Sequence, residues 1–372
     1  MINIDWDTMP NLPELTLVVP TYTRHNHALR QMHFWSDSPV TLHVLDGTNK
    51  PIESERLKSI GDNVHYHHLP YSYEERFGRS IEFIDTPYVS LLCDDEFFIP
   101  SALNHCIEEL KAHKDFVAYA GRCLDFYSTK KGIVAKPAYL EMKDYRSFGT
   151  KSGDRMIKHM NPYVHSALYA VHRSEIWKKN MAILSKKKFS TPYGVEVQFE
   201  LATSYQGKSM VTEELMWLKN KKNTAIDIKE FDRKLYFHEW IKDTRYTDEV
   251  NFFYKNMTTE LTKIDGADIE KVQADFKLAV EAYLDFFKNE RLPLSYIKLR
   301  NRLMTTIPQK LKRELEEINV IFRWRQIIKE AEKMQKDGVT VDIKQLQEIV
   351  DFIEKFNEKH NLKIYGKNVK LD

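Results

Sequence analysis

Three consecutive acids, Asp94, Asp95 and Glu96, directly follow the apolar run "YVSLLC". Adjacent carboxylates repel one another, and the cost rises when they are partly buried. They therefore need a solvent-facing turn, basic partners or a metal ion, and oxygen-rich carboxylates suit Mg²⁺ or Mn²⁺. The cluster is the first candidate site of the chain, and an acidic strand-end turn without metal is the alternative.

Two other strand-like runs also end in polar residues. "LTLVVP" is followed by Thr21, Tyr22 and Arg24, and "VTLHVLD" ends in Asp46 before Gly47. In open α/β sheets, ligands bind beyond the carboxyl ends of the strands, where loops and helix N-termini converge. One strand that ends in polar residues is usually followed by a solvated turn. Three successive strands that end in polar residues predict a shared binding edge.

The elements that must position these residues alternate between residues 15 and about 231. The β-rich runs are "LTLVVP", "VTLHVLD", "NVHYHHL", "YVSLLCDD", "FVAYAGRCLDFY" and "HSALYAVH", and the predicted helices include residues 26–35 and 80–84. This alternation is typical of a largely parallel sheet with covering helices. We therefore predict an α/β fold for this part of the chain.

The pattern changes near residue 265. No glycine occurs between Gly266 and Gly338, and apolar residues recur at helical spacing, at Ile269, Val272, Phe276, Val280 and Phe287. A last helix is predicted after Asp342, which is a suitable N-cap. We predict one domain over residues 1–265 and a helical C-terminal domain over residues 266–372.

Composition excludes several classes of protein. The 372 residues are 42% hydrophobic, which is ample for a core, and the formal net charge of +2 gives no global attraction to nucleic acid. The 3 cysteines are too few for a disulfide framework or a zinc site. No signal-peptide pattern and no apolar window of about 18 residues occurs. We expect a cytoplasmic protein without a membrane span or a nucleic-acid partner.

Three segments together carry a family resemblance. The chain resembles family 2 of the GT-A glycosyltransferases over about residues 15 to 240, through Val19-Pro20-Thr21-Tyr22-x-Arg24, Val44-Leu45-Asp46-Gly47, and Asp94-Asp95-Glu96 with Pro100 after it. The resemblance implies a GT-A catalytic domain with a Rossmann-like mixed sheet. It also implies a nucleotide-sugar donor at the carboxyl edge of that sheet. Thr21, Tyr22 and Asp46 would lie near the base and ribose, with Pro20 and Arg24 on the same edge.

The same resemblance makes the acidic cluster a site for Mn²⁺ or Mg²⁺. A divalent cation that bridges both donor phosphates would stabilise the doubly charged leaving group. Cys93 stands where the family commonly has its first Asp, so Asp95 is the predicted main ligand and Glu96 a secondary one. Asp94 is a further candidate, and a role in which Asp94 and Glu96 only hydrogen-bond the ribose or bound water stays open. His238, in "RKLYFHEW", is an additional candidate ligand, because in many GT-A enzymes a histidine further along the chain than the base binds the metal.

The segment "TPYGVEVQFELAT" contains the candidate general base. Glu196 lies two residues after Gly194 at a predicted helix start, and Glu200 lies one turn later on the same face. The segment resembles the family's Gly-Glu-Asp motif, whose second acid acts as base, although Val195 replaces the first acid. A carboxylate in this place can accept the proton of an acceptor hydroxyl. The alternative is an acid that only favours the helix N-terminus.

Two arginines precede the acidic cluster. Arg76 and Arg79, in "YEERFGRSIEFI", lie where the family places an arginine near the diphosphate, and a guanidinium fork matches phosphate oxygens. The alternative is a solvated helix start in which they pair with Glu74 and Glu75. His165, in "VHSALYAVH", could line an acceptor pocket.

A basic run extends from Lys298 to Arg313 without an acid and with interleaved apolar residues. It predicts a peripheral contact with an anionic membrane, on the inner face, where a lipid-linked acceptor would lie. The alternative is an amphipathic helix pair that packs on the first domain or on a second subunit of a homo-oligomer.

The resulting hypothesis is a metal-dependent, inverting glycosyltransferase of surface polysaccharide synthesis, with a glycan or lipid-linked acceptor. One alternative is a sugar nucleotidyltransferase, although "PTYTRHNHALR" lacks the glycines that usually grip a triphosphate. The other is a non-catalytic carbohydrate-binding or scaffold protein.

Overall fold

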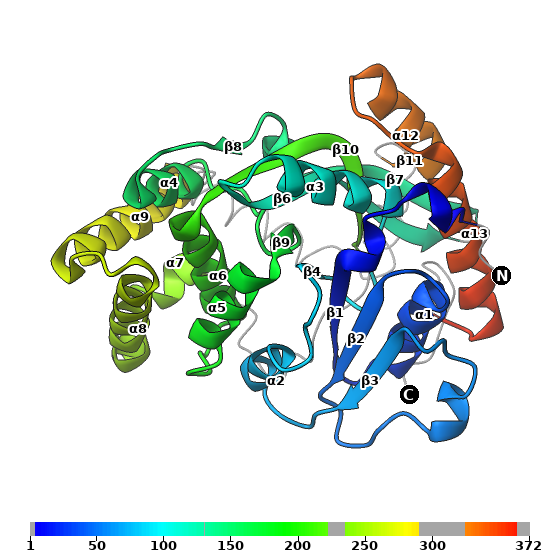
Figure 1. Cartoon of the computed structure of the whole chain (residues 1–372), viewed down its shortest axis with the longest axis horizontal. Coiled ribbons are helices and arrows are strands. Elements are labelled where there is room, and N and C mark those ends of the chain that lie inside the picture. The colour runs from blue at the N-terminus through cyan, green and yellow to red at the C-terminus, as the bar shows by residue number, and fades with distance from the viewer. Residues whose placement is uncertain (1–3, 130, 222–234, 290–323, 363–372) are drawn as a thin grey trace, which may run out of the picture.

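The computed structural model describes residues 4–129, 131–221, 235–289 and 324–362 (Figure 1). Eleven strands of these residues form one mixed sheet, in the order β11-β7-β6-β9-β4-β1-β2-β3, and β10 pairs with β5, β6 and β8. The predicted α/β fold, with a mixed sheet and helices in the C-terminal region, is confirmed.

The parallel part of the sheet comes from the first four predicted runs. It consists of β1 (Leu15–Thr21), β2 (Thr41–Asp46), β3 (Val64–His68) and β4 (Tyr88–Leu91), in the order β3-β2-β1-β4. In β1, Leu17 and Val19 point into one core cluster and Val18 into another on the opposite face. Burial on both faces explains the continuous apolar run, because a parallel strand covered on two sides shows no alternation.

Seven further strands of the described residues complete the sheet, and β6 and β10 are its longest strands. The seven strands are β5 (Phe97–Phe98), β6 (Phe116–Thr129), β7 (Gly132–Ala138), β8 (Arg146–Ser147), β9 (Val171–Arg173), β10 (Lys208–Asn220) and β11 (Arg325–Gln326). β9 runs antiparallel to both β4 and β6, whereas β10 runs parallel to β6. The carboxyl end of β10 is therefore directed like those of the parallel strands.

Eight helices are described up to residue 265. They are α1 (His25–Trp35), α2 (Tyr73–Ser80), α3 (Pro100–Ala112), α4 (Ser152–Met160), α5 (Ser174–Leu184), α6 (Pro192–Gln206), α7 (Phe237–Trp240) and α8 (Thr247–Asp265). Short 3₁₀ turns lie at Trp6–Thr8, Leu12–Glu14, Ser54–Leu57, Leu140–Met142 and Thr244–Tyr246.

Two predictions from the sequence are wrong in detail. The helix predicted at residues 80–84 lies earlier in the chain and ends at Ser80. Its start is set by a capping box, in which Ser72 and Glu75 each accept a hydrogen bond from the other's backbone N–H group. Most of the run "HSALYAVH" forms a loop instead of a strand, and only its end lies in β9. That loop is held by a buried carboxylate from α6, a long-range contact that a local pattern does not reveal.

The helices after residue 265 pack on two separate parts of the molecule (Figure 1). α9 (Ile269–Asn289) joins a core cluster with α4, α6 and α8, whereas α12 (Ile327–Lys336) and α13 (Ile343–Lys359) join the main core beside α1 and β7. The predicted N-cap of the last helix is confirmed, since Asp342 accepts a hydrogen bond from the Gln345 N–H at 2.9 Å. The basic run from Lys298 to Arg313 lies outside the described residues.

None of the described helices combines the length and the apolar character needed to cross a membrane.

Candidate active site

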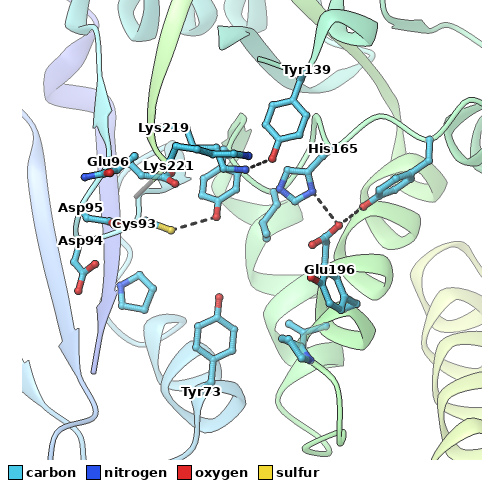
Figure 2. A pocket seen from close by; sticks show the side chains of 18 of the residues that line it. Tyr73, Cys93, Asp94, Asp95, Glu96, Tyr139, His165, Glu196, Lys219 and Lys221 are labelled. Carbon is cyan, nitrogen blue, oxygen red and sulfur yellow. Dashed lines mark hydrogen bonds and ion pairs between the residues drawn. The ribbon is translucent and has the colours of Figure 1, made fainter. Parts of the chain in front are cut away.

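A cavity of about 880 Å³ lies between the carboxyl ends of β1, β4 and β10 and the N-terminus of α6 (Figure 2). It gathers ten of the residues selected from the sequence: Pro20, Thr21, Tyr22, Arg24, Arg76, Asp94, Asp95, Glu96, His165 and Glu196. The structure thus brings the acidic cluster and the candidate base to one cavity. The roles predicted for these residues stay predictions.

The three acids and their arginine form one side, which we call the acidic wall (Arg24, Asp94, Asp95 and Glu96). The acids follow the end of β4 in a tight turn and are only 5–6% exposed, so they are not a solvated turn. Arg24 forms ion pairs with Asp94 and with Asp95, the latter at 2.9 Å. A basic partner is therefore what makes the crowded carboxylates tolerable.

Burial and crowding alter the acid strength of this wall. Burial raises the pKa of Asp94 to about 6, although Arg24 opposes the rise. Burial and the neighbouring Asp95 raise the pKa of Glu96 to about 8, and its Oε2 accepts a hydrogen bond from Trp217 Nε1 at 2.6 Å. Part of the negative charge of the wall is thus suppressed near neutral pH.

Helix α1 supports the backbone of the acidic turn from behind. Arg30, only 2% exposed, donates to the Asp95 carbonyl at 3.3 Å and to Asn357 Oδ1 of α13 at 2.9 Å. Gln31 donates to the Glu96 carbonyl. The last described helix therefore reaches the acidic wall through Arg30.

The carboxylate oxygens of the acidic wall are largely engaged by the protein itself. Asp94 Oδ2 accepts from Thr21 at 2.7 Å and its Oδ1 meets Arg24, which also holds Asp95 Oδ1. Among the described residues, no group of three or more His, Cys, Asp or Glu side chains could hold a metal ion. As arranged, these residues do not fit a metal held by the protein alone. The predicted Mn²⁺ or Mg²⁺ stays a prediction.

Glu196 lies opposite the acidic wall, in the first turns of α6. That helix begins with Thr191 as N-cap and Pro192 at its first position, which fixes the direction of its start. Glu196 Oε1 accepts hydrogen bonds from the Tyr163 hydroxyl at 2.6 Å and from His165 Nδ1 at 3.0 Å. We call Glu196, His165 and Tyr163 the base wall.

The electrostatics of the base wall are opposite to those of the acidic wall. Burial would raise the pKa of Glu196, but His165 and Tyr163 outweigh it and lower that pKa below the ordinary value. Burial would lower the pKa of His165, but Glu196 and Glu200 raise it. Glu196 is therefore a carboxylate at neutral pH, which is the state that a general base needs.

Glu200 has a different environment from Glu196, although it lies one turn later on the same helix. It is fully buried and its Oε2 lies 2.8 Å from His159 Nε2. It also accepts from the backbone N–H groups of Ala167 and Leu168, at 3.0 Å each. Glu200 thus organises the loop that precedes β9.

The cavity contains residues that the sequence analysis did not select. Tyr139, Tyr169 and Lys219 line it, and Lys219 at the end of β10 bonds the Tyr139 hydroxyl. Trp217 is buried outside the lining and stacks between Tyr139 and Tyr169, with ring centroids 5.5 and 4.2 Å away. Lys221 also lines the cavity. The sequence contained a signal for Lys219 and Lys221, because "LMWLKNK" is another apolar run that ends in polar residues.

Three predicted site residues lie outside the cavity lining. Asp46 is buried at the end of β2, where it accepts from Tyr66 at 2.6 Å and from the Thr48 N–H at 2.8 Å. Arg79 lies over the ring of Tyr71, 4.4 Å from its centroid. His238 lies in α7 and stacks on Phe287, at 5.2 Å between ring centroids, and Phe287 in turn lines the cavity.

Arg76 lines the cavity but also supports the end of β1. It is 1% exposed, and its Nη1 donates to the Thr21 carbonyl at 2.5 Å. Its guanidinium fills the space beside Gly47, where an added Cβ would lie 2.0 Å from Arg76 Nη1. The glycine after β2 is thus required by the close approach of this arginine.

Solved structures similar to this chain include several of S. aureus TarS. The crystal structure of TarS 1-349 is 11% identical, covers 96% of this chain and 94% of that chain, and gives a TM-score of 0.44. The complex of TarS 1-349 with UDP-GlcNAc has the same identity and coverage with a TM-score of 0.49, and the complex with UDP is 12% identical with a TM-score of 0.44. No family model and no curated protein matches the sequence. Such low identities and TM-scores carry no argument on function, which rests on the cavity itself.

Proposed function

We propose that this chain is a glycosyltransferase of the GT-A type, which moves a sugar from a nucleotide-sugar donor to a hydroxyl of a glycan or lipid-linked acceptor. One observation carries the proposal. An ionised carboxylate held by two donors, Glu196, faces the same cavity as a set of charged residues at the carboxyl ends of parallel strands. Such an edge is where open α/β sheets bind nucleotides.

The geometry of Glu196 supports its role as general base. Its Oε1 is held by two donors, whereas its Oε2 has no hydrogen-bonding partner among the described residues. In the proposed step, the acceptor oxygen forms a bond to the anomeric carbon while the acceptor proton moves to Oε2. The bond from the anomeric carbon to the phosphate oxygen breaks, and its electron pair leaves with the diphosphate. Attack assisted by one base on the opposite face inverts the anomeric centre.

Basic side chains in the cavity supply charge for the leaving diphosphate. Arg24, Arg76, Lys219 and Lys221 all line it, and guanidinium and ammonium groups stabilise phosphate oxygens through charge-assisted hydrogen bonds. Thr21 and Tyr22 lie on the same side as Arg24, as the predicted nucleotide site requires. No step in this scheme is assigned to a metal ion.

A panel of nucleotide sugars tests the proposal through thermal stability and turnover. A donor that binds only the folded state should raise Tm, and it should be hydrolysed slowly without acceptor. UDP-GlcNAc, which one of the TarS structures contains, is a practical first member of the panel. If no donor raises Tm and none is hydrolysed, the proposal is contradicted and a non-catalytic protein is favoured. Pyrophosphate release from a nucleoside triphosphate and a sugar phosphate would instead favour a nucleotidyltransferase.

The same panel, run with Mn²⁺ and with EDTA, tests the predicted metal. Loss of turnover in EDTA that Mn²⁺ restores would support the metal site at Asp95. Equal turnover in both would contradict it.

The broader setting is also part of the proposal. It comprises surface polysaccharide synthesis, a location at the inner membrane face and a homo-oligomer. The basic run from Lys298 to Arg313 is the proposed membrane contact, and salt-dependent pelleting with anionic vesicles tests it.

A further inference from the structure

His165 makes the contact that distinguishes the base wall from the rest of the cavity. Its Nδ1 lies 3.0 Å from Glu196 Oε1, the oxygen that also accepts from Tyr163. Figure 2 shows the imidazole and the carboxylate directed toward one another on the side of the cavity opposite Asp94 and Asp95. Because two donors hold one oxygen, the direction of the other oxygen is set as well.

The loop that carries His165 is anchored by the helix that carries Glu196. Residues 164–170 have no regular secondary structure, yet Glu200 of α6 accepts from the backbone N–H groups of Ala167 and Leu168. Glu196 and Glu200 are one turn apart on α6. The same rigid element therefore positions the candidate base and, through the loop, its imidazole partner, which is how precise sites are usually built.

The charges around His165 favour an ion pair with Glu196. The imidazole lies between two carboxylates, since its Nδ1 is also 3.9 Å from Glu200 Oε1. The ionisable groups that face this pair include Lys219 of β10, Glu96 and five tyrosines, which are Tyr163, Tyr73 of α2, Tyr283 of α9, and Tyr139 and Tyr169, whose ring centroids lie 5.8 and 5.4 Å from that of His165. The pKa of each tyrosine is raised, mainly by burial, so all five stay neutral. Lys219 adds to the effect of His165 in lowering the pKa of Glu196.

We propose that His165 is a positioning residue, which as an imidazolium keeps Glu196 ionised and keeps its Oε2 directed into the cavity. Glu200 contributes by holding the loop of His165 in place. The inference rests on the proposed role of Glu196 as general base. It adds that the base is not an isolated carboxylate but half of a partly buried ion pair.

The pH profile of turnover separates this role from a merely structural one. In the parent protein, kcat for hydrolysis of the nucleotide sugar selected by the panel should fall only below about pH 4.5, since the pKa of Glu196 is depressed. In His165→Leu, burial should dominate, and the acid limb should rise by about 1–3 pH units. His165→Gln keeps an N–H donor but not the charge, so the acid limb of its pH profile should lie between those of the parent and His165→Leu. KM for the donor should change little in both variants.

A measurement without turnover tests the pairing directly. The imidazole NMR signal of His165, assigned by its loss in His165→Gln, should titrate above pH 6.5 in the parent. In Glu196→Gln it should titrate at a lower pH, because the main opposing charge is gone. His105→Gln, which removes a partly exposed histidine of α3, should change neither the NMR titration nor the pH profile.

The outcomes distinguish this inference from the proposed function. A His165 titration that does not respond to Glu196→Gln, or an acid limb that stays in place in His165→Leu and His165→Gln, would overturn the inference even if transfer is found. The expected NMR shift without turnover of any nucleotide sugar would support the ion pair and refute the proposed function. If His165→Leu does not fold, the His165→Gln profile and the NMR titration still decide.

Discussion

The acidic wall and the base wall hold carboxylates in the same cavity, but in opposite electrostatic settings. In the acidic wall, Asp94 and Asp95 share one close arginine, and the pKa values of Asp94 and Glu96 rise to about 6 and about 8. In the base wall, Glu196 faces an imidazole and a phenol, and its pKa falls. The immediate neighbours, more than the cavity as a whole, therefore decide which carboxylate is charged. Pairs of groups whose pKa values are driven apart are a feature of acid–base sites.

Glu196→Gln, in the base wall, should reduce turnover more than the other substitutions. An amide preserves the shape and can still accept from Tyr163, but it cannot take a proton, so turnover should fall by about 10²–10⁴-fold. Donor binding, followed by Tm shift, should remain. Glu200→Gln, one turn away, removes no proton acceptor from the cavity but weakens the hold on the loop of His165, so it should lower turnover much less than Glu196→Gln. Full activity in Glu196→Gln with loss in Glu200→Gln would mean that the base has been assigned to the wrong turn of α6.

Arg24→Met should break the acidic wall. It leaves Asp94 and Asp95 buried without their closest cation, and loss of one partner of a buried pair costs about 3–5 kcal/mol. Urea unfolding at pH 7 measures the change. Arg245→Met, which removes an exposed ion pair with Asp243, is the control and should change stability little. Equal effects of the two substitutions would contradict the role given to Arg24.

Asn357→Leu tests the acidic wall from the side of α13, because Arg30 joins that helix to the acidic turn. The substitution removes an acceptor from Arg30, which is buried behind Asp95. Leaving a buried donor unpaired costs about 1–3 kcal/mol. Gln347→Leu, on the exposed surface of α13, is the control. The acid limb of the pH profile should not move in either variant, and a shift would mean that the two walls are coupled.

Asp342→Ala should have the smallest effect and should spare both walls. It removes the N-cap of α13, which is worth about 1 kcal/mol. Asp342→Asn should keep most of that stability, since an amide oxygen also caps. A change in turnover beyond the loss of stability would show that α13 acts on the cavity directly.

Much of the fold was predictable because its signals are local. The first four apolar runs form the parallel strands β1 to β4, and Asp342 caps the last helix as predicted. The wrong helix at residues 80–84 was avoidable, because Ser72 and Glu75 already form a capping-box pattern. The loop at residues 164–170 was not predictable in this way, since its geometry depends on Glu200, more than 30 positions later.

The sequence predicted most of the residues that meet at the sheet edge. Polar residues at the ends of parallel strands converge, because all the carboxyl ends lie on one side, although Asp46 at the end of β2 bonds Tyr66 and Thr48 outside the cavity lining. The contacts that each residue makes there depend on the tertiary structure. Arg24 reaches Asp94 across 70 positions, and Tyr163 reaches Glu196 across 33, so these contacts depend on how the elements pack. The charge state of a carboxylate follows from such contacts, and for that reason Glu96 and Glu196 differ although they are the same residue type.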